Sequence, residues 1–328
     1  MQGDQRKSII NMTKEELRND CERFLRCKTI DDSNDLFDIY IEFLFNAVLN
    51  HHSEAVYRHS DADAKIVLQM MMTKALHLKS IIQGISYQAK NGSSLNRIVD
   101  PTIVASLVRN IYETVAMFNL IYRCTQSSDE REILYLLWVH AGLKYRQRFE
   151  SNITSDENRE KYEKEKDEIK NIINRIKETE LYKSLDKKNQ LKIMIKIKEK
   201  DYLMEFEGTK VKFLHWHDLT EKMGIKKGLL DNIYTYFSLY SHPSNVSVFQ
   251  FSEMFKKEEK SFLNITNFNL RLTFWLFSIF IADYINLFPN VINTFNSMSI
   301  RDQIVINFYN RVARSHKYSI NDSWKAVE

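Results

Sequence analysis

The scarcity of glycine and proline is the feature that most constrains the fold of this chain. Only 7 glycines and 3 prolines occur among 328 residues, whereas these residue types usually make up roughly 7% and 5% of a protein. Because glycine and proline form most tight turns and end many helices, a chain with so few of them favours long helices. We therefore predict an all-α protein that folds as a multi-helix bundle.

Apolar residues recur with the helical period in three long segments, 33–59, 102–123 and 262–288. Each segment has a wide apolar face, which is typical of a helix that packs against a core. The expected domain organisation is a frayed N-terminus over 1–12, followed by a single helical domain over 13–328.

Charged residues dominate the segment 155–200, in which a few isoleucines and Tyr162 form only a narrow apolar stripe. Such a stripe is typical of helices that pack at one edge of a protein or are largely solvated. We interpret the segment as a charged helical hairpin inserted into the domain. A solvated hairpin with no binding role is the simpler alternative to an interaction surface.

The apolar period changes to two near 201–214, where apolar residues alternate on both sides of Glu207-Gly-Thr-Lys210. Alternation around a turn that contains glycine is typical of a β-hairpin, so one small β-hairpin is expected there. We also expect a helix over 61–88 and an extended run over 245–251.

The composition argues against several functional classes. The net charge is +4 and is spread along the chain, whereas a general nucleic-acid binder usually has a larger basic excess. The cysteines Cys21, Cys27 and Cys124 lack metal-ligand spacing, and their odd number argues against a disulfide framework. The most apolar segment, 272–281, has about half of the roughly 20 residues that span a membrane. We expect a cytoplasmic protein without membrane contact.

Five histidines form two groups, but neither group has the spacing of a known zinc site. We expect the first group to be a solvated helix end, and the second to point to opposite faces of a strand. The sequence therefore predicts no functional metal and no cofactor. The two groups are His51, His52 and His59, and His215 and His217.

Three polar residues with helical spacing precede Pro243. Tyr234, Ser238 and His242 fall at i, i+4 and i+8, which places them on one side of a helix. The residue before a proline is pushed out of the α region, so His242 is expected at the helix end, open to a cleft.

A charged pair interrupts the apolar face of the helix expected over 102–123. Arg109 and Glu113 are four residues apart and can pair on that face. The pair is either an ordinary surface interaction or a charged group that is held for a partner elsewhere in the chain.

Three blocks together resemble an uncharacterised group of bacterial all-helical proteins. The resemblance covers roughly residues 100–245, and its marks are an Arg-x3-Glu helix and a late Tyr-x3-Ser-x3-His helix. The blocks are 107–113, 138–148, and 213–224 leading to Tyr234-x3-Ser238-x3-His242.

That group is similar in style to the HEPN helical bundles of bacterial conflict systems, many of which are metal-independent ribonucleases. The resemblance implies a role in antiviral defence. The usual HEPN mark is an arginine followed four to six residues later by a histidine, and Arg311-Val-Ala-Arg-Ser-His316 has this spacing. Val312 departs from the polar residue that often follows the arginine.

RNA cleavage without a metal needs a group that takes the proton of the 2′-hydroxyl and a cation that stabilises charge on phosphorus. Histidine and arginine meet these two needs. Either Arg109 with His242 or Arg311 with His316 could supply the pair, and two separate blocks of sequence converge on the first.

The first functional hypothesis is a bacterial nuclease or nucleotide-processing effector that binds RNA or a nucleotide. The alternative is a non-catalytic helical module in which the same side chains form a structural polar network, and which binds a protein partner or a second copy of the chain. An Arg109–His242 contact that opens to a cleft favours the first, and a sealed contact favours the second. The candidate catalytic residues are Arg109, Glu113, Tyr234, Ser238 and His242, with Arg311 and His316 as the second set.

Overall fold

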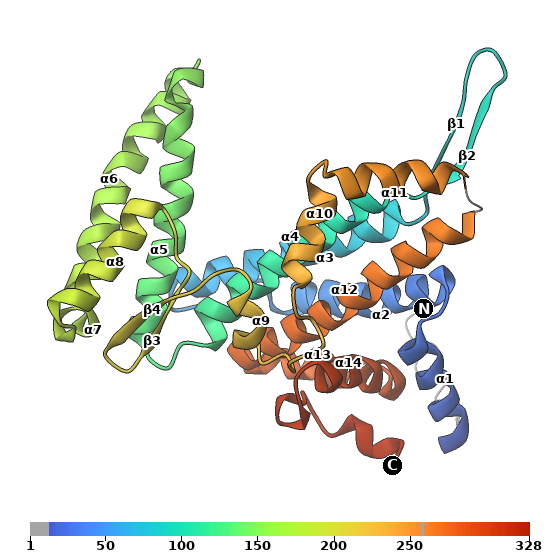
Figure 1. Ribbon diagram of the computed structural model, residues 1–328. Coiled ribbons are helices and arrows are strands. Elements are labelled where there is room, and N and C mark those ends of the chain that lie inside the picture. Colours follow the sequence, from blue (N-terminus) through green and yellow to red (C-terminus); the bar gives the residue numbers. More distant parts are fainter. Residues whose placement is uncertain (1–12, 257–258) are drawn as a thin grey trace, which may run out of the picture. The chain divides into compact units, whose positions relative to one another are not determined.

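A computed structural model describes residues 13–256 and 259–328 (Figure 1). The described chain is mostly helical, with only two small antiparallel β-hairpins, which confirms the predicted all-α fold. The expectation of a frayed N-terminus over 1–12 lies outside the described residues.

Two compact units make up the structure. The first contains the chain up to Ala116 together with Gly224–Glu328, and the second is Met117–Met223. The charged segment 155–200 lies within the second unit. Whether the chain folds as one cooperative domain stays a prediction.

Two capping boxes start the first unit. Thr13 and Glu16 cap α1, Lys14–Arg26, and Thr29 and Asp32 cap α2, Ile30–His51. In each box the threonine hydroxyl accepts from a backbone N–H, and the acidic side chain accepts from the threonine N–H. The single helix expected over 33–59 is wrong at its end, because α2 stops at His51 and α3 occupies His59–Ile81.

The core of the first unit forms around α12, Glu259–Leu287, which contacts α2 and α14, Ile300–Ala313 (Figure 1). Phe274 of α12 lies edge-on to Phe37 at 5.0 Å and stacks on Tyr40 at 5.5 Å. The segment Leu263–Leu287 is long and apolar enough to cross a membrane, but 72% of its most apolar window is buried inside the protein. Burial of this kind is typical of a core helix in a soluble protein.

Proline ends α12 as expected. Pro289 opens a 3₁₀ turn, Pro289–Val291, which leads to α13, Ile292–Asn296. After α14 the chain closes with two further 3₁₀ turns, His316–Tyr318 and Ser323–Ala326.

A buried ion pair joins α12 to the residue that follows α14. Arg314 Nη1 and Nη2 each donate to one Asp283 oxygen at 2.7 Å, and the two side chains are 0% and 2% exposed. The Arg314 guanidinium also lies 4.6 Å from the Tyr318 ring centroid. Two parallel hydrogen bonds of this kind form a bidentate, charge-assisted pair.

Two expectations for the first unit are wrong. The helix expected over 61–88 ends at Ile81, and β1, Ile85–Gln88, pairs with β2, Ser94–Ile98, in a hairpin that projects from the unit (Figure 1). Gly84 adopts φ +75°, which favours glycine and breaks the helix. The run 245–251 is helical within α11, Asn245–Lys256, because the Ser244 hydroxyl accepts from the Ser247 N–H and caps it.

The second unit is a helical layer with one β-hairpin. α4, Pro101–Phe118, belongs to the first unit except for its last two residues, and a π-helix, Asn119–Arg123, follows it in the second unit. Tyr162, Ile169, Ile172 and Ile176 of α6 are buried, and α6 contacts α5. The other elements are α5, Ser128–Arg146, a 3₁₀ turn, Gln147–Asn152, α6, Asp156–Glu178, α7, Glu180–Ser184, α8, Lys187–Glu199, and α9, Asp218–Lys222.

The β-hairpin expected near 201–214 is confirmed. β3, Met204–Glu207, pairs with β4, Lys210–Phe213, and Gly208 has φ +61° in the turn between them. Met204 and Val211 point inward and are buried, whereas Glu207 and Lys210 are exposed. The alternation of the sequence therefore matches the two faces of the hairpin.

Candidate functional site

The site begins on α4 of the first unit. Asp100 precedes this helix, and its Oδ1 accepts from the Thr102 N–H at 2.8 Å and from the Thr102 hydroxyl at 2.7 Å. Farther along the helix, Arg109 Nε donates to Glu113 Oε1 at 2.9 Å. The i,i+4 spacing therefore forms the expected ion pair and fixes one edge of the guanidinium.

The second part of the site is α10, Ile233–Ser241. His242 follows it with φ −110° and ψ 149°, an extended conformation that Pro243 imposes on the residue before it. The loop is held by Ser247, whose hydroxyl donates to the carbonyl oxygens of Ser244 at 2.9 Å and His242 at 3.3 Å. The expectation that His242 lies at the helix end is confirmed, and its side chain is exposed.

Arg109 joins the two parts. Its Nη2 donates to the Tyr234 hydroxyl at 2.6 Å, and its Nη1 lies 3.3 Å from His242 Nε2. Its guanidinium carbon lies 4.7 Å from the Tyr234 ring centroid. Because arginine only donates, a hydrogen bond in this contact requires His242 Nε2 to be the acceptor. We call Arg109, Glu113, Tyr234 and His242 the Arg109 cluster.

The cluster is partly open to solvent. The Arg109 and Glu113 side chains are 19% and 29% exposed, and His242 is exposed. The guanidinium is therefore held on one side by protein groups and remains accessible to water on the other. Of its five N–H groups, three have protein acceptors among the described residues.

Ser238 does not join the cluster. Its hydroxyl donates to the Tyr234 carbonyl oxygen at 2.8 Å, which is a bond within its own helix. Serine commonly makes this i−4 bond when it lies inside a helix. The structure therefore places Ser238 beside the cluster without giving it a contact to Arg109 in the described part of the chain.

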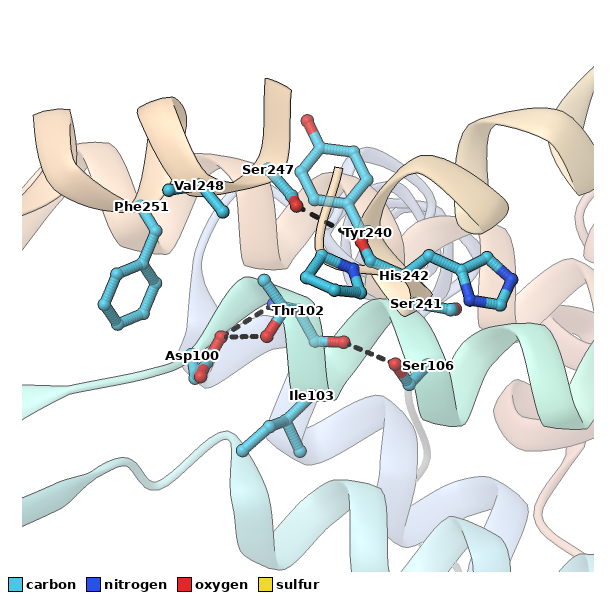
Figure 2. Close-up of a pocket in the computed structure, with 11 residues that line it drawn as sticks. Asp100, Thr102, Ile103, Ser106, Tyr240, Ser241, His242, Ser247, Val248 and Phe251 are labelled. Carbon is cyan, nitrogen blue, oxygen red and sulfur yellow. Dashed lines mark hydrogen bonds between the residues drawn. The ribbon is translucent and has the colours of Figure 1, made fainter. Parts of the chain in front are cut away.

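A pocket of about 510 Å³ shares His242 with the cluster, and Figure 2 shows the residues that line it. It is bounded by the start of α4, the end of α10 and one face of α11. His242 belongs to both the pocket and the cluster, and Ser106 lies one turn before Arg109 on α4. The pocket is lined by Asp100, Thr102, Ile103, Ser106, Tyr240, Ser241, His242, Pro243, Ser247, Val248 and Phe251.

The second expected set of catalytic residues has a different environment. The Arg311 guanidinium lies 4.3 Å from the Trp324 ring centroid, near the C-terminus. His316 is exposed on the 3₁₀ turn that follows α14. In residues 13–256 and 259–328, no described contact joins Arg311 to His316. The six-residue motif therefore has the sequence spacing of a HEPN site, but its arginine and histidine side chains are not in contact in the described residues.

Lys74 is a polar neighbour of the cluster that sequence reasoning missed. It lies on α3, and its Nζ donates to the Thr114 hydroxyl, one residue from Glu113. Burial lowers the pKa of Lys74 to about 8, and the charge of Glu113 opposes this shift. A lysine on a helix of mixed polarity gives no sequence signal for such a position.

His52 and His59 are exposed as expected, but the other three histidines are not placed as expected. His51 is buried, with ring nitrogens 2.8 Å from Glu54 Oε1 and 2.9 Å from Thr294 Oγ1, so a solvated helix end is wrong for this residue. The rings of His215 and His217 do not diverge but stack at 5.4 Å, because these residues follow β4 in a turn. Among the described residues, no three His, Cys, Asp or Glu side chains are placed to hold a metal ion.

One protein family matches the chain. The profile of DUF5677, described as a family of unknown function, covers residues 75–261. This range includes the Arg109 cluster and every residue that lines the pocket, and it excludes Arg311 and His316. Comparisons with curated proteins and with solved structures give no match.

Proposed function

The chain belongs to the DUF5677 family of unknown function, and we propose that it is a metal-independent ribonuclease or nucleotide-processing enzyme whose site is the Arg109 cluster. One observation carries the proposal: Arg109 contacts His242 at the edge of an open pocket. The resemblance to HEPN bundles adds bacterial antiviral defence as the proposed setting.

Arg109 supplies the cation. A planar guanidinium can bind two phosphate oxygens at once, and it keeps its charge at every relevant pH. Glu113 and Tyr234 occupy Nε and one Nη2 hydrogen, which fixes the direction of the N–H groups that remain. A pre-oriented cation of this kind stabilises the charge that develops on phosphorus.

His242 supplies the proton transfer. As the 2′ oxygen attacks phosphorus, an unprotonated imidazole nitrogen accepts the proton of the 2′-hydroxyl. The bond to the 5′ oxygen then breaks, and the leaving oxygen takes a proton from the imidazolium, so that a 2′,3′-cyclic phosphate and a 5′-hydroxyl remain. The 3.3 Å contact between Arg109 and His242 is long for a hydrogen bond, so a substrate phosphate can displace it at little cost.

The Arg109 cluster also supports a second candidate function, a structural polar network in a protein-binding module. Three Arg109 donors already have protein acceptors, as in networks that specify a unique core. The partial exposure of Arg109 and Glu113 favours the catalytic proposal, because a network that only stabilises the core does not need access to solvent.

RNA cleavage by matched variants tests the proposal. The purified full chain is incubated with labelled single-stranded RNA in EDTA, as wild type, Arg109→Lys and His242→Gln. Removal of a general base or of a charge-stabilising group typically lowers the rate by about 100-fold or more. The controls are Arg311→Lys and His316→Gln, which alter the rival pair and are expected to keep wild-type rates. A wild type without cleavage, or equal losses in His316→Gln and His242→Gln, contradicts the proposal.

A further inference from the structure

The pocket beside the Arg109 cluster has two chemically different ends. Figure 2 shows Phe251 and Asp100 toward one end and His242 toward the other, with Ser241 and Ser106 close to His242. A ligand that spans the pocket therefore meets an aromatic, apolar surface at one end and the polar cluster at the other. We call these the Phe251 end and the His242 end.

The Phe251 end suits a flat, weakly polar ring. Ile103 and Val248 are 50% and 57% exposed although both are apolar. Both line the pocket together with Phe251, and Figure 2 shows Val248 next to Phe251. Any of the nucleobases can stack on an aromatic side chain, because each base has a flat π-face. Asp100 lies at the same end, where its carboxylate repels phosphate and can accept from a base amino group.

The His242 end suits a phosphate. His242 Nε2 lies 3.3 Å from Nη1 of the Arg109 guanidinium, which carries a positive charge. Ser241 also lines the pocket, and its Oγ is buried without a hydrogen-bond partner among the described residues. Charge therefore orients a phosphorylated ligand along the pocket.

We infer that the pocket holds one unpaired nucleotide, with its base at the Phe251 end and its phosphate at the Arg109 cluster. The inference rests on the proposed function, since it names the part of RNA or of a nucleotide that the site binds. The volume of about 510 Å³ lies within the range of roughly 300–1,000 Å³ for small-molecule sites. A base inside a duplex is stacked on its neighbours and cannot enter, so the substrate is a single-stranded RNA or a free nucleotide.

Calorimetric titration of the full chain with adenosine 5′-monophosphate, adenosine and inorganic phosphate tests the inference. The monophosphate is expected to bind at least about tenfold more tightly than either fragment, because it alone reaches both ends. Phe251→Ala is expected to weaken monophosphate binding by about tenfold, as loss of base stacking does, and to leave phosphate binding unchanged. Phe249→Ala is the matched control, because Phe249 is on the same helix, 63% exposed, and outside the pocket lining.

A second pair of variants covers the case in which Phe251→Ala does not fold. Val248→Asp places a carboxylate at the Phe251 end, and Val246→Asp makes the same change at an exposed position outside the pocket lining. Only the first is expected to weaken monophosphate binding. Equal effects within either pair, or no difference in affinity between the monophosphate and inorganic phosphate, overturn the inference.

The experiments distinguish failure of the nucleotide-pocket assignment from failure of the proposed RNA cleavage. Binding of the monophosphate that depends on Phe251, in a protein that does not cleave RNA, supports the pocket assignment and overturns only the proposed activity. RNA cleavage that depends on His242 but is equal in Phe251→Ala and Phe249→Ala overturns the pocket assignment and leaves the activity in place.

Discussion

The Tyr234 hydroxyl lies 2.6 Å from Arg109 Nη2, although 125 residues separate them in the sequence. The same tyrosine ring lies beneath the guanidinium, 4.7 Å from its central carbon. One side chain therefore both accepts from Arg109 and covers one of its faces. This contact joins α4 to α10 and fixes the direction in which the guanidinium points.

Tyr234→Phe removes the hydrogen-bond acceptor and keeps the ring. We expect the free energy of unfolding to fall by about 1 kcal/mol, since a half-open site lets water replace part of the lost bond. RNA cleavage is expected to fall by more than this change in stability explains, because Arg109 loses its orientation. Urea denaturation and cleavage rates measure the two effects, with the exposed Tyr57→Phe as the control. Identical results for the two variants contradict the expectation.

Asp283→Ala tests the sealed ion pair of the first unit. The substitution leaves the charge of Arg314, whose side chain is 0% exposed, without its carboxylate. We expect a loss of about 3–5 kcal/mol in the free energy of unfolding, as for other buried pairs that lose one partner. Asp322→Ala is the control, because its pair with Lys325 is 71% and 60% exposed and is expected to contribute less than about 1 kcal/mol. A loss below about 1 kcal/mol in Asp283→Ala contradicts the buried-charge argument.

Lys74 predicts a pH dependence of stability. Its pKa in the folded protein is about 8, below its ordinary value of 10.5, so the folded state binds fewer protons than the unfolded state between these values. The free energy of unfolding therefore rises with pH between about 8 and 10.5. The destabilisation caused by the buried charge of Lys74 is fully present below about pH 8. Lys74→Met is expected to remove this rise, whereas Lys90→Met, at an exposed position, is expected to keep it. Denaturation curves from pH 7 to 10 measure the slope, and equal slopes for Lys74→Met and wild type contradict the prediction.

Local rules account for the parts of the site that could be predicted from the sequence. The i,i+4 spacing of Arg109 and Glu113 gives their ion pair, and Pro243 forces His242 out of the helix. Both effects act within a few residues and need no knowledge of the fold. Contact between the two blocks, by contrast, depends on the packing of α4 with α10.

Other expectations failed because a local signal was ambiguous. The alternating residues of 245–251 resemble a strand, but a serine cap and packing of one face make them helical. Ser238 shares a helix face with Tyr234 and His242, yet its hydroxyl donates to the Tyr234 carbonyl oxygen within the same helix. A spacing rule identifies which side chains share a helix face, and it does not identify their hydrogen-bond partners.

Arginine placement shows the same limit at longer range. Arg311 has the spacing of the HEPN motif but lies against Trp324, whereas Arg314, three residues later, is buried with Asp283. Nothing in the local sequence distinguishes the two arginines. Arg311 lies in the last turn of α14 and Arg314 directly follows the helix, so their environments depend on how this end of α14 packs within the unit.

Arg109→Met separates the active-site interpretation from the structural-network interpretation. In a network sealed from solvent, the substitution would leave the Glu113 carboxylate buried without its cation. The free energy of unfolding would then fall by about 3–5 kcal/mol, as expected for Asp283→Ala. The Arg109 and Glu113 side chains are instead 19% and 29% exposed, so water can solvate the carboxylate that remains. Sites held for function also often lower stability. We therefore expect a loss of less than about 1 kcal/mol, or a small gain, in the free energy of unfolding.

The same variant is expected to lose RNA cleavage and most of its affinity for adenosine 5′-monophosphate, because no cation remains at the His242 end of the pocket. Urea denaturation, cleavage rates and calorimetry on one preparation measure all three quantities. Arg311→Met is the control, since it removes an arginine of the same unit that contacts Trp324 and lies outside the pocket lining. A loss of about 3 kcal/mol or more in Arg109→Met, with RNA cleavage intact, would identify the Arg109 cluster as a structural network.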